Sequence, residues 1–88
     1  MKLNGTFTLR EIAGEILVIP VGKTALNLNG MIILNPVSKV IWECLEKEAT
    51  REELLTAVCD AFEVETADAE QDLDEFLEEL RKQDLLCE

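Results

Sequence analysis

The spacing of hydrophobic residues along the chain changes at Asn35, which divides the sequence into a strand part and a helix part. Before Asn35, apolar and polar positions alternate in TFTLREI and, less strictly, in EILVIPV, and the turn-forming pair Ala13-Gly14 separates these segments. Alternation with a period of two predicts half-buried β-strands. We therefore expect one strand around residues 7–12 and a second over residues 15–21.

A third strand is predicted at residues 31–34, where four apolar residues stand in a row. Successive side chains of a strand point to opposite faces. Met31 and Ile33 therefore share one face. Ile32 and Leu34 share the other. Only one of these pairs can lie fully in the core, and the sequence leaves open which one it is.

The connection before this strand, residues 22–29, is polar. It contains Leu26 and Leu28 as candidates to extend a strand. The following pair Asn29-Gly30 predicts a turn.

From Asn35 onward, apolar residues recur every three or four positions, which predicts three helices. Asn35 is a good cap for the first helix, and Pro36 suits its first position, where no N–H partner is needed. Thr50 and Glu53 form a capping-box motif that opens the second helix. The third helix is expected from about residue 66 to 83. The apolar residues of its inner face are Ala69, Leu73, Phe76, Leu77 and Leu80.

The order of three strands and then three helices predicts an α+β fold, with a small antiparallel sheet and helices packed on one side. The same order can be read as a winged-helix-like domain. A chain of 88 residues suits a single domain, residues 1–88. Because only 5% of the residues are aromatic, the core must consist mainly of aliphatic side chains. No apolar run approaches membrane-spanning length, so we expect a soluble, cytoplasmic protein.

The net charge of −11 is concentrated in the helical part of the chain. Residues 1–42 carry a net charge of +2, whereas residues 43–88 carry −13. An acidic helical surface repels phosphate backbones, and the third predicted helix, DAEQDLDEFLEEL, lacks the Lys and Arg of a recognition helix. The charge argues against nucleic acid as a partner. It favours a basic surface or a cationic peptide, although acidic helices also serve solubility alone.

The residue types that build most catalytic and metal sites are missing. The chain has no His, which removes the usual general base and the usual nitrogen ligand of a metal. Ser38 has no His to activate it. Cys44, Cys59 and Cys87 are too widely spaced for a CxxC pair or a disulfide framework. We expect Cys44 and Cys59 to be buried, Cys87 to be exposed, and the protein to have no catalytic residue, metal or cofactor.

Several segments together resemble the coenzyme PQQ (pyrroloquinoline quinone) synthesis protein D family. They are GEILVIPVG, LNLNGMIILNPVSKVIWECLE, TREELLTAVCDAF and AEQDLDEFLEELRKQDLL, and the resemblance covers about residues 7–86. Its most distinctive pieces are Asn35, Ser38 and Trp42 after the apolar strand and the DLDEFLEEL…LL ending.

This resemblance implies three antiparallel strands followed by three helices. It also implies a non-catalytic adaptor, a peptide-recognition element of systems that modify ribosomally made peptides. Such an adaptor captures the leader segment of a precursor peptide and presents it to a modifying enzyme, often a radical S-adenosylmethionine (SAM) protein.

The resemblance further implies that the leader adds as a strand to the edge of the third strand, beside a groove closed by the third helix. An edge strand with unpaired backbone groups is a template for such addition. The expected peptide-binding residues are Met31, Ile32, Ile33, Leu34, Asp72, Leu73, Glu75, Phe76, Glu79 and Leu80. The acidic members of this set are expected to rim the groove and to meet Lys or Arg of the leader.

Two alternative functions remain open. The edge of the third strand can instead pair with a second copy, which would make the protein a structural or oligomeric subunit. An acidic winged-helix domain that binds another protein is the other alternative. The sequence does not separate monomer from homodimer. It identifies neither the peptide nor its modification, and it does not say whether PQQ is the product.

Overall fold

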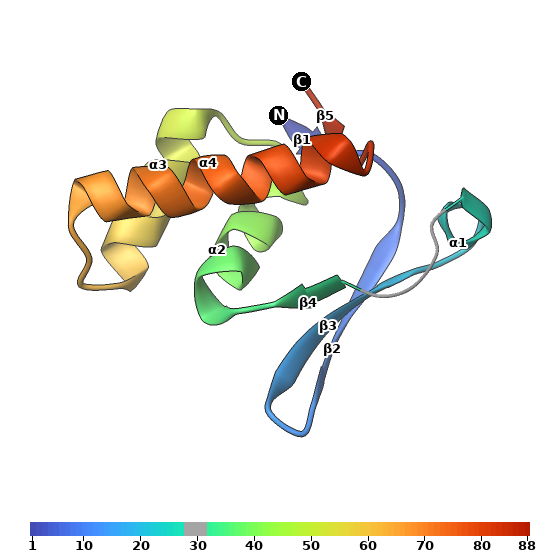
Figure 1. Ribbon diagram of the computed structural model, residues 1–88. Coiled ribbons are helices and arrows are strands. Elements are labelled where there is room, and N and C mark those ends of the chain that lie inside the picture. The colour runs from blue at the N-terminus through green and yellow to red at the C-terminus, as the bar shows by residue number, and fades with distance from the viewer. Residues whose placement is uncertain (28–31) are drawn as a thin grey trace.

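A three-stranded antiparallel sheet followed by three long helices forms the body of the protein (Figure 1), as the sequence predicts. The structure is a computed structural model that describes residues 1–27 and 32–88. The strands are β1 (Lys2–Leu3), β2 (Phe7–Ile12), β3 (Glu15–Pro20), β4 (Ile32–Leu34) and β5 (Leu86–Cys87). The helices are α1 (Thr24–Asn27), α2 (Pro36–Leu45), α3 (Arg51–Ala61) and α4 (Thr66–Lys82).

The main sheet has the strand order β2-β3-β4, and both pairings are antiparallel. Ala13 and Gly14 connect β2 to β3 with positive φ angles of 53° and 81°. In Figure 1 this hairpin projects from the body formed by α2, α3 and α4. On β4, Leu34 lies opposite Ile16 and Ile33 lies opposite Leu17. β4 is therefore an edge strand of the sheet that the structure describes.

The alternation along β4 decides which face meets the core. Leu34 is buried and Ile32 packs against the core, whereas Ile33 is 63% exposed. The face of β4 that packs on the core is therefore the one with Ile32 and Leu34, which the sequence alone did not decide. Met31 and the predicted turn at Asn29-Gly30 lie outside the described residues.

The predicted helix caps are present and set where α2 and α3 begin. Asn35 Oδ1 accepts a hydrogen bond of 2.8 Å from the Ser38 N–H, and Pro36 occupies the first position of α2. Thr50 Oγ1 accepts from the Glu53 N–H at 3.1 Å, while Glu53 Oε1 accepts from the Thr50 N–H at 2.9 Å. Because Asn35 directly follows β4, the chain turns at once from the edge strand into α2.

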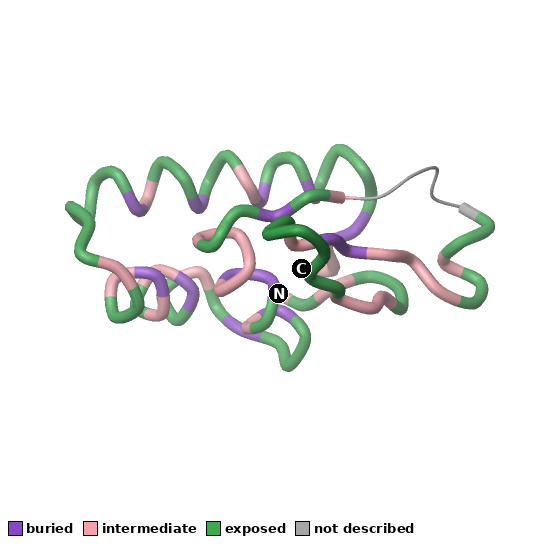
Figure 2. The backbone as a smooth tube through the Cα atoms, turned by 90° about the horizontal axis from the view of Figure 1, so that it is seen from below, coloured by how far each residue is buried: buried purple, intermediate pink, exposed green. Residues whose placement is uncertain are grey.

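The hydrophobic core lies between the sheet and the three long helices. Figure 2 shows buried residues recurring along one side of α4, the side that faces the rest of the molecule. The largest fully buried side chains are Trp42, Ile41, Leu45, Leu54, Leu73, Leu77, Leu80, Val18 and Val58. Each such aliphatic side chain contributes about 1.5–3 kcal/mol of burial free energy, so the helices are held mainly by this shared core.

The connection after β3 departs from the prediction. Leu26, a candidate to extend a strand, lies in the short helix α1 and is 84% exposed. The turn begins at Gly22, whose φ of 59° suits glycine. Thr24 then ties this turn to the start of β2, because its Oγ1 accepts a 2.8 Å hydrogen bond from the Thr6 N–H. Leu28 lies outside the described residues.

A second, two-stranded sheet joins the two chain ends and was not predicted. In this sheet Lys2 lies opposite Cys87, so Cys87 is half-buried rather than exposed as expected. Cys44 and Cys59 are also half-buried, packing against the core without being fully enclosed. No helix in residues 1–27 and 32–88 is long and apolar enough to cross a membrane.

Candidate functional site

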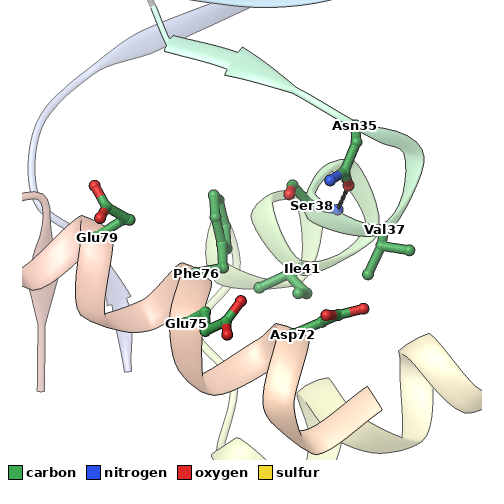
Figure 3. A pocket seen from close by; sticks show the side chains of 8 residues that line it. All are labelled: Asn35, Val37, Ser38, Ile41, Asp72, Glu75, Phe76 and Glu79. Carbon is green, nitrogen blue, oxygen red and sulfur yellow. Dashed lines mark hydrogen bonds between the residues drawn. The ribbon is translucent and has the colours of Figure 1, made fainter. Parts of the chain in front are cut away.

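An open pocket of about 250 Å³ lies between the start of α2 and the middle of α4, beside the end of β4 (Figure 3). We call it the α2–α4 pocket. It is lined by Asn35, Val37, Ser38, Ile41, Asp72, Glu75, Phe76 and Glu79. The α4 members are three or four residues apart, which brings them onto one face of the helix. The Asn35 cap orients the first turn of α2 against that face.

The floor of the α2–α4 pocket is apolar. Ile41 is fully buried, while Val37 and Phe76 are half-buried and pack against the core. In Figure 3 the Phe76 ring points from α4 toward β4. The part of Phe76 that is not covered by the core is therefore available to an apolar side chain entering beside β4.

The rim of the α2–α4 pocket is acidic. Asp72, Glu75 and Glu79 are all exposed. Glu75 Oε1 accepts a hydrogen bond of 3.2 Å from Gln71, and Glu79 Oε1 lies 3.8 Å from Lys82 Nζ. The Asp72 carboxylate makes no hydrogen bond or ion pair with any described residue. Among the described residues, Lys82 is thus the one cation within 4.0 Å of the three rim carboxylates.

Neighbouring carboxylates on α4 are neutralised by arginine and do not line the pocket. Arg51 of α3 donates two hydrogen bonds of 2.9 Å to Asp74. The hydrogen bond from Arg51 holds the pKa of Asp74 below its ordinary value of 3.8. Arg81 lies 3.6 Å from Glu78. Arg51 and Arg81 therefore pair with carboxylates that do not line the α2–α4 pocket, and the rim keeps its negative charge.

The backbone of β4 supplies the other half of the site. Residues of an antiparallel strand alternate between bonding their partner strand and pointing both backbone groups away from it. At least one residue of Ile32–Leu34 therefore directs its N–H and C=O away from β3. No strand in residues 1–27 or 32–88 pairs with that side. Such an edge accepts a further strand.

The structure distributes the expected site residues among three environments. Those that line the α2–α4 pocket are Asp72, Glu75, Phe76 and Glu79. Those of the edge strand are Ile32, Ile33 and Leu34. Leu73 and Leu80 are 0% and 1% exposed in the core and do not line the pocket. Met31 lies outside the described residues.

The α2 side of the pocket was missed by sequence reasoning. Its members are Asn35, Val37, Ser38 and Ile41. The sequence already accounts for Asn35 as a helix cap and for Ile41 as part of the apolar face of a helix. Neither residue was therefore considered as part of a binding site. The available signal was the position of the cap one residue after the apolar strand, which forces the first turn of α2 to lie beside the strand edge.

The described part of the chain has neither a cluster of metal-ligating side chains nor a buried polar side-chain atom without a partner. Residues 1–27 and 32–88 contain no group of three or more His, Cys, Asp or Glu arranged to hold a metal ion. In the same residues, no buried side-chain nitrogen or oxygen lacks a hydrogen-bond partner.

Comparisons with known proteins identify the family. Residues 22–86 match the family described as coenzyme PQQ synthesis protein D (PqqD), whose domains are generally non-catalytic binding domains. A solved structure of TbiB1 in complex with the TbiA(beta) leader peptide is similar, with a TM-score of 0.72 and 27% sequence identity. The similarity covers 98% of this chain and 94% of TbiB1. A comparison with curated proteins found no match. Both the predicted fold and the predicted resemblance are confirmed, and the chain belongs to the coenzyme PQQ synthesis protein D family.

Proposed function

We propose that this protein is a non-catalytic adaptor that binds the leader segment of a ribosomally made precursor peptide as an added strand on β4. The observation that carries the proposal is the position of the unpaired β4 edge next to the α2–α4 pocket. The similarity to TbiB1, which was solved with a leader peptide bound, supports it.

Strand addition and the pocket act on different parts of the peptide. A strand added to β4 lies about 4.7–4.9 Å from it and forms backbone hydrogen bonds that do not depend on peptide sequence. Alternate side chains of that strand point to the core side of the sheet, where α4 forms the facing wall. An apolar side chain from this set enters the α2–α4 pocket and packs on Val37 and Phe76.

The acidic rim adds a preference for cationic peptides. Lys or Arg of the leader pairs with Asp72, Glu75 or Glu79. These carboxylates are exposed, and Lys82 lies 3.8 Å from Glu79. Each exposed ion pair of this kind contributes about 0.2–1 kcal/mol and weakens with salt. Affinity therefore comes mainly from the backbone bonds and the apolar floor, while the rim provides selectivity.

The adaptor then presents the bound precursor to a modifying enzyme. A radical SAM enzyme is the first class to test, because the family resemblance points to it. Since the precursor is made on ribosomes, we propose that binding occurs in the cytoplasm. The acidic helical surface disfavours nucleic acid as a partner.

The direct test is an NMR titration of the labelled protein with a synthetic leader peptide encoded by the short open reading frame nearest its gene. We expect saturable shifts at Ile32–Leu34 and at residues 72–79. Shifts confined to other regions would refute the proposed site. Sedimentation of the same sample distinguishes peptide binding from pairing of β4 with a second copy, which would instead give a concentration-dependent dimer without peptide.

A matched pair of variants tests the pocket itself. Phe76 and Phe62 are both half-buried and both pack against the core, but only Phe76 lines the α2–α4 pocket. Phe76→Ala is expected to weaken leader binding by about tenfold or more. Phe62→Ala is expected to cost stability but to leave the affinity of the folded protein unchanged. Equal affinity losses would show that binding responds to core packing rather than to the pocket.

A further inference from the structure

The face of the main sheet that points away from the core carries a row of apolar side chains. We call this the outer face, and its apolar members are Ile12, Leu17, Ile19 and Ile33. Leu17 is buried, but none of the four belongs to the packed core cluster between the sheet and the helices. Ile12 is 54% exposed and Ile33 is 63% exposed. Packing against the core therefore does not explain why Ile12 and Ile33 are apolar.

A comparison of Leu17 with Ile33 indicates what is missing from the outer face. The two residues lie directly opposite each other on β3 and β4. Leu17 has a strand on each side, with Arg10 of β2 as its other neighbour, and is only 8% exposed. Within residues 1–27 and 32–88, Ile33 has a strand on one side only, that of Leu17. The greater exposure of Ile33 is that expected of a strand residue at the edge of a sheet.

Building on the proposed function, we propose that Ile33 is a second specificity determinant, which requires the bound leader strand to present an apolar side chain on the outer face. A strand added to β4 extends the sheet, so its side chains alternate between the α2–α4 pocket side and the outer face. Residues directly opposite each other across a strand pair have their Cβ atoms about 4.5–5.5 Å apart, close enough for Ile33 to contact its peptide partner.

The chemical class of peptide follows from this geometry. The leader segment carries apolar side chains at adjacent positions, one for the pocket and the next for Ile33. A strictly alternating apolar and polar strand satisfies the pocket but leaves Ile33 facing a polar side chain.

Ile12 distinguishes the leader from other occupants of the outer face. A protein partner or a second copy docked flat on this face would cover Ile12 as well as Ile33. An added strand covers Ile33 alone, because Ile12 lies on β2 at the other edge of the sheet, near the hairpin tip. Ile12 is therefore a matched control residue, with the same side chain, a similar exposure and the same face.

The experiment is a double-mutant cycle between the protein and a synthetic leader peptide. Ile33→Thr and Ile12→Thr keep a β-branched residue in each strand, and thermal melts check that both variants fold. Ser is substituted at each position of the leader strand in turn, and affinities are measured by calorimetry. Ile33→Thr is expected to weaken binding of the unmodified leader by about two- to fivefold. Ile12→Thr is expected to leave it unchanged.

The test lies in which leader position is coupled to which protein residue. Ser at one position of the leader should abolish the effect of Ile33→Thr on affinity, and Ser at an adjacent position should abolish the effect of Phe76→Ala. Unchanged affinity in Ile33→Thr, with Phe76→Ala still weakened, would overturn this inference alone. Equal losses in Ile33→Thr and Ile12→Thr would overturn it in favour of a broad docking surface. Lack of binding by the unmodified protein would instead overturn the proposed function.

Discussion

Phe7 of β2 and Trp42 of α2 meet edge to face, with their ring centroids 5.1 Å apart and their planes at 81°. Trp42 is 1% exposed, and Phe7 packs against the core from the sheet side. Aromatic pairs in this arrangement contribute about 0.5–1.5 kcal/mol beyond their buried area. The pair ties the sheet to the helix that supplies Val37 and Ile41 to the α2–α4 pocket, so the packing of the core also positions the site.

Removal of the Trp42 ring should strongly destabilise the protein. Trp42→Ala leaves a large cavity next to Phe7 and is expected to lower the free energy of unfolding by about 3–5 kcal/mol. Urea denaturation followed by circular dichroism measures this change. Val64→Ala, at a 42% exposed position, is the control and should change the value by less than about 0.5 kcal/mol. A Trp42→Ala protein as stable as this control would contradict the assigned core.

Gly5 should tolerate alanine less well than Gly14 does. Gly5 has a φ of 121°, and a Cβ there would lie 2.9 Å from Thr24 Oγ1 and 3.1 Å from a Phe7 ring carbon. Gly14 also has a positive φ, but a Cβ there would meet open space. Gly14→Ala is expected to cost about 1–2 kcal/mol of backbone strain. Gly5→Ala should cost more, because the steric overlap adds to the strain; thermal unfolding of both variants tests this order.

The capping box of α3 should be measurable by a single substitution. Thr50→Ala removes the hydroxyl that accepts the Glu53 N–H, and it is expected to lower the free energy of unfolding by about 1 kcal/mol. Thr50→Ser retains the hydroxyl and should lie close to the unmodified protein in the same chemical denaturation experiment. Equal losses in both variants would assign the effect to the threonine methyl group rather than to the cap.

The same cap should make part of the stability depend on pH. The hydrogen bond from the Thr50 backbone N–H holds the pKa of Glu53 below its ordinary value of 4.5. A carboxyl group whose pKa is depressed by folding stabilises the protein above pH 4.5, and this contribution disappears as the pH falls through the folded-state pKa. Glu53→Gln should therefore be less stable than the unmodified protein at neutral pH.

That difference in stability should shrink as the pH falls below 4.5 and vanish once Glu53 is protonated. Urea denaturation over this pH range measures it. Glu63→Gln, in the loop after α3, is the control for general loss of negative charge. A difference between Glu53→Gln and the unmodified protein that stays constant with pH would rule out the charge of Glu53 as its source.

The acidic rim should contribute locally to binding of a cationic leader. Asp72→Asn combined with Glu75→Gln is expected to reduce affinity at low salt by about two- to fivefold per charge removed. The loss should diminish at high salt. Glu52→Gln combined with Asp60→Asn removes the same charge from α3, away from the pocket. If this control pair weakens binding equally, net charge rather than the rim governs the effect.

Much of the fold follows from local chemistry that a sequence displays directly. Asn35 and Thr50 were predicted as caps because their side chains bond backbone groups only three residues away. The orientation of β4 was not predictable, because the choice between Ile33 and Leu34 for the core depends on pairing with β3. The two-stranded β1–β5 sheet was missed because strands of two residues are too short to show alternation.

The division of the α4 stripe was beyond sequence reasoning for a similar reason. Leu73, Phe76 and Leu80 share one helical face by spacing. Only the packing of the neighbouring elements against that face decides that Leu73 and Leu80 are enclosed while Phe76 stays partly open. Periodicity identifies which side of a helix is covered, but the margin of that covered side is set by the neighbouring helix.

The described edge of β4, Ile32–Leu34, has a kinetic consequence for the proposed adaptor. Backbone hydrogen bonds to these residues contribute about 0.5–1.5 kcal/mol each net, whatever the sequence of the peptide. Differences in affinity between leaders would therefore arise at the α2–α4 pocket and its rim, and they would appear mainly as differences in residence time. In the proposed adaptor, these side-chain contacts would set how long each precursor stays bound before it is released.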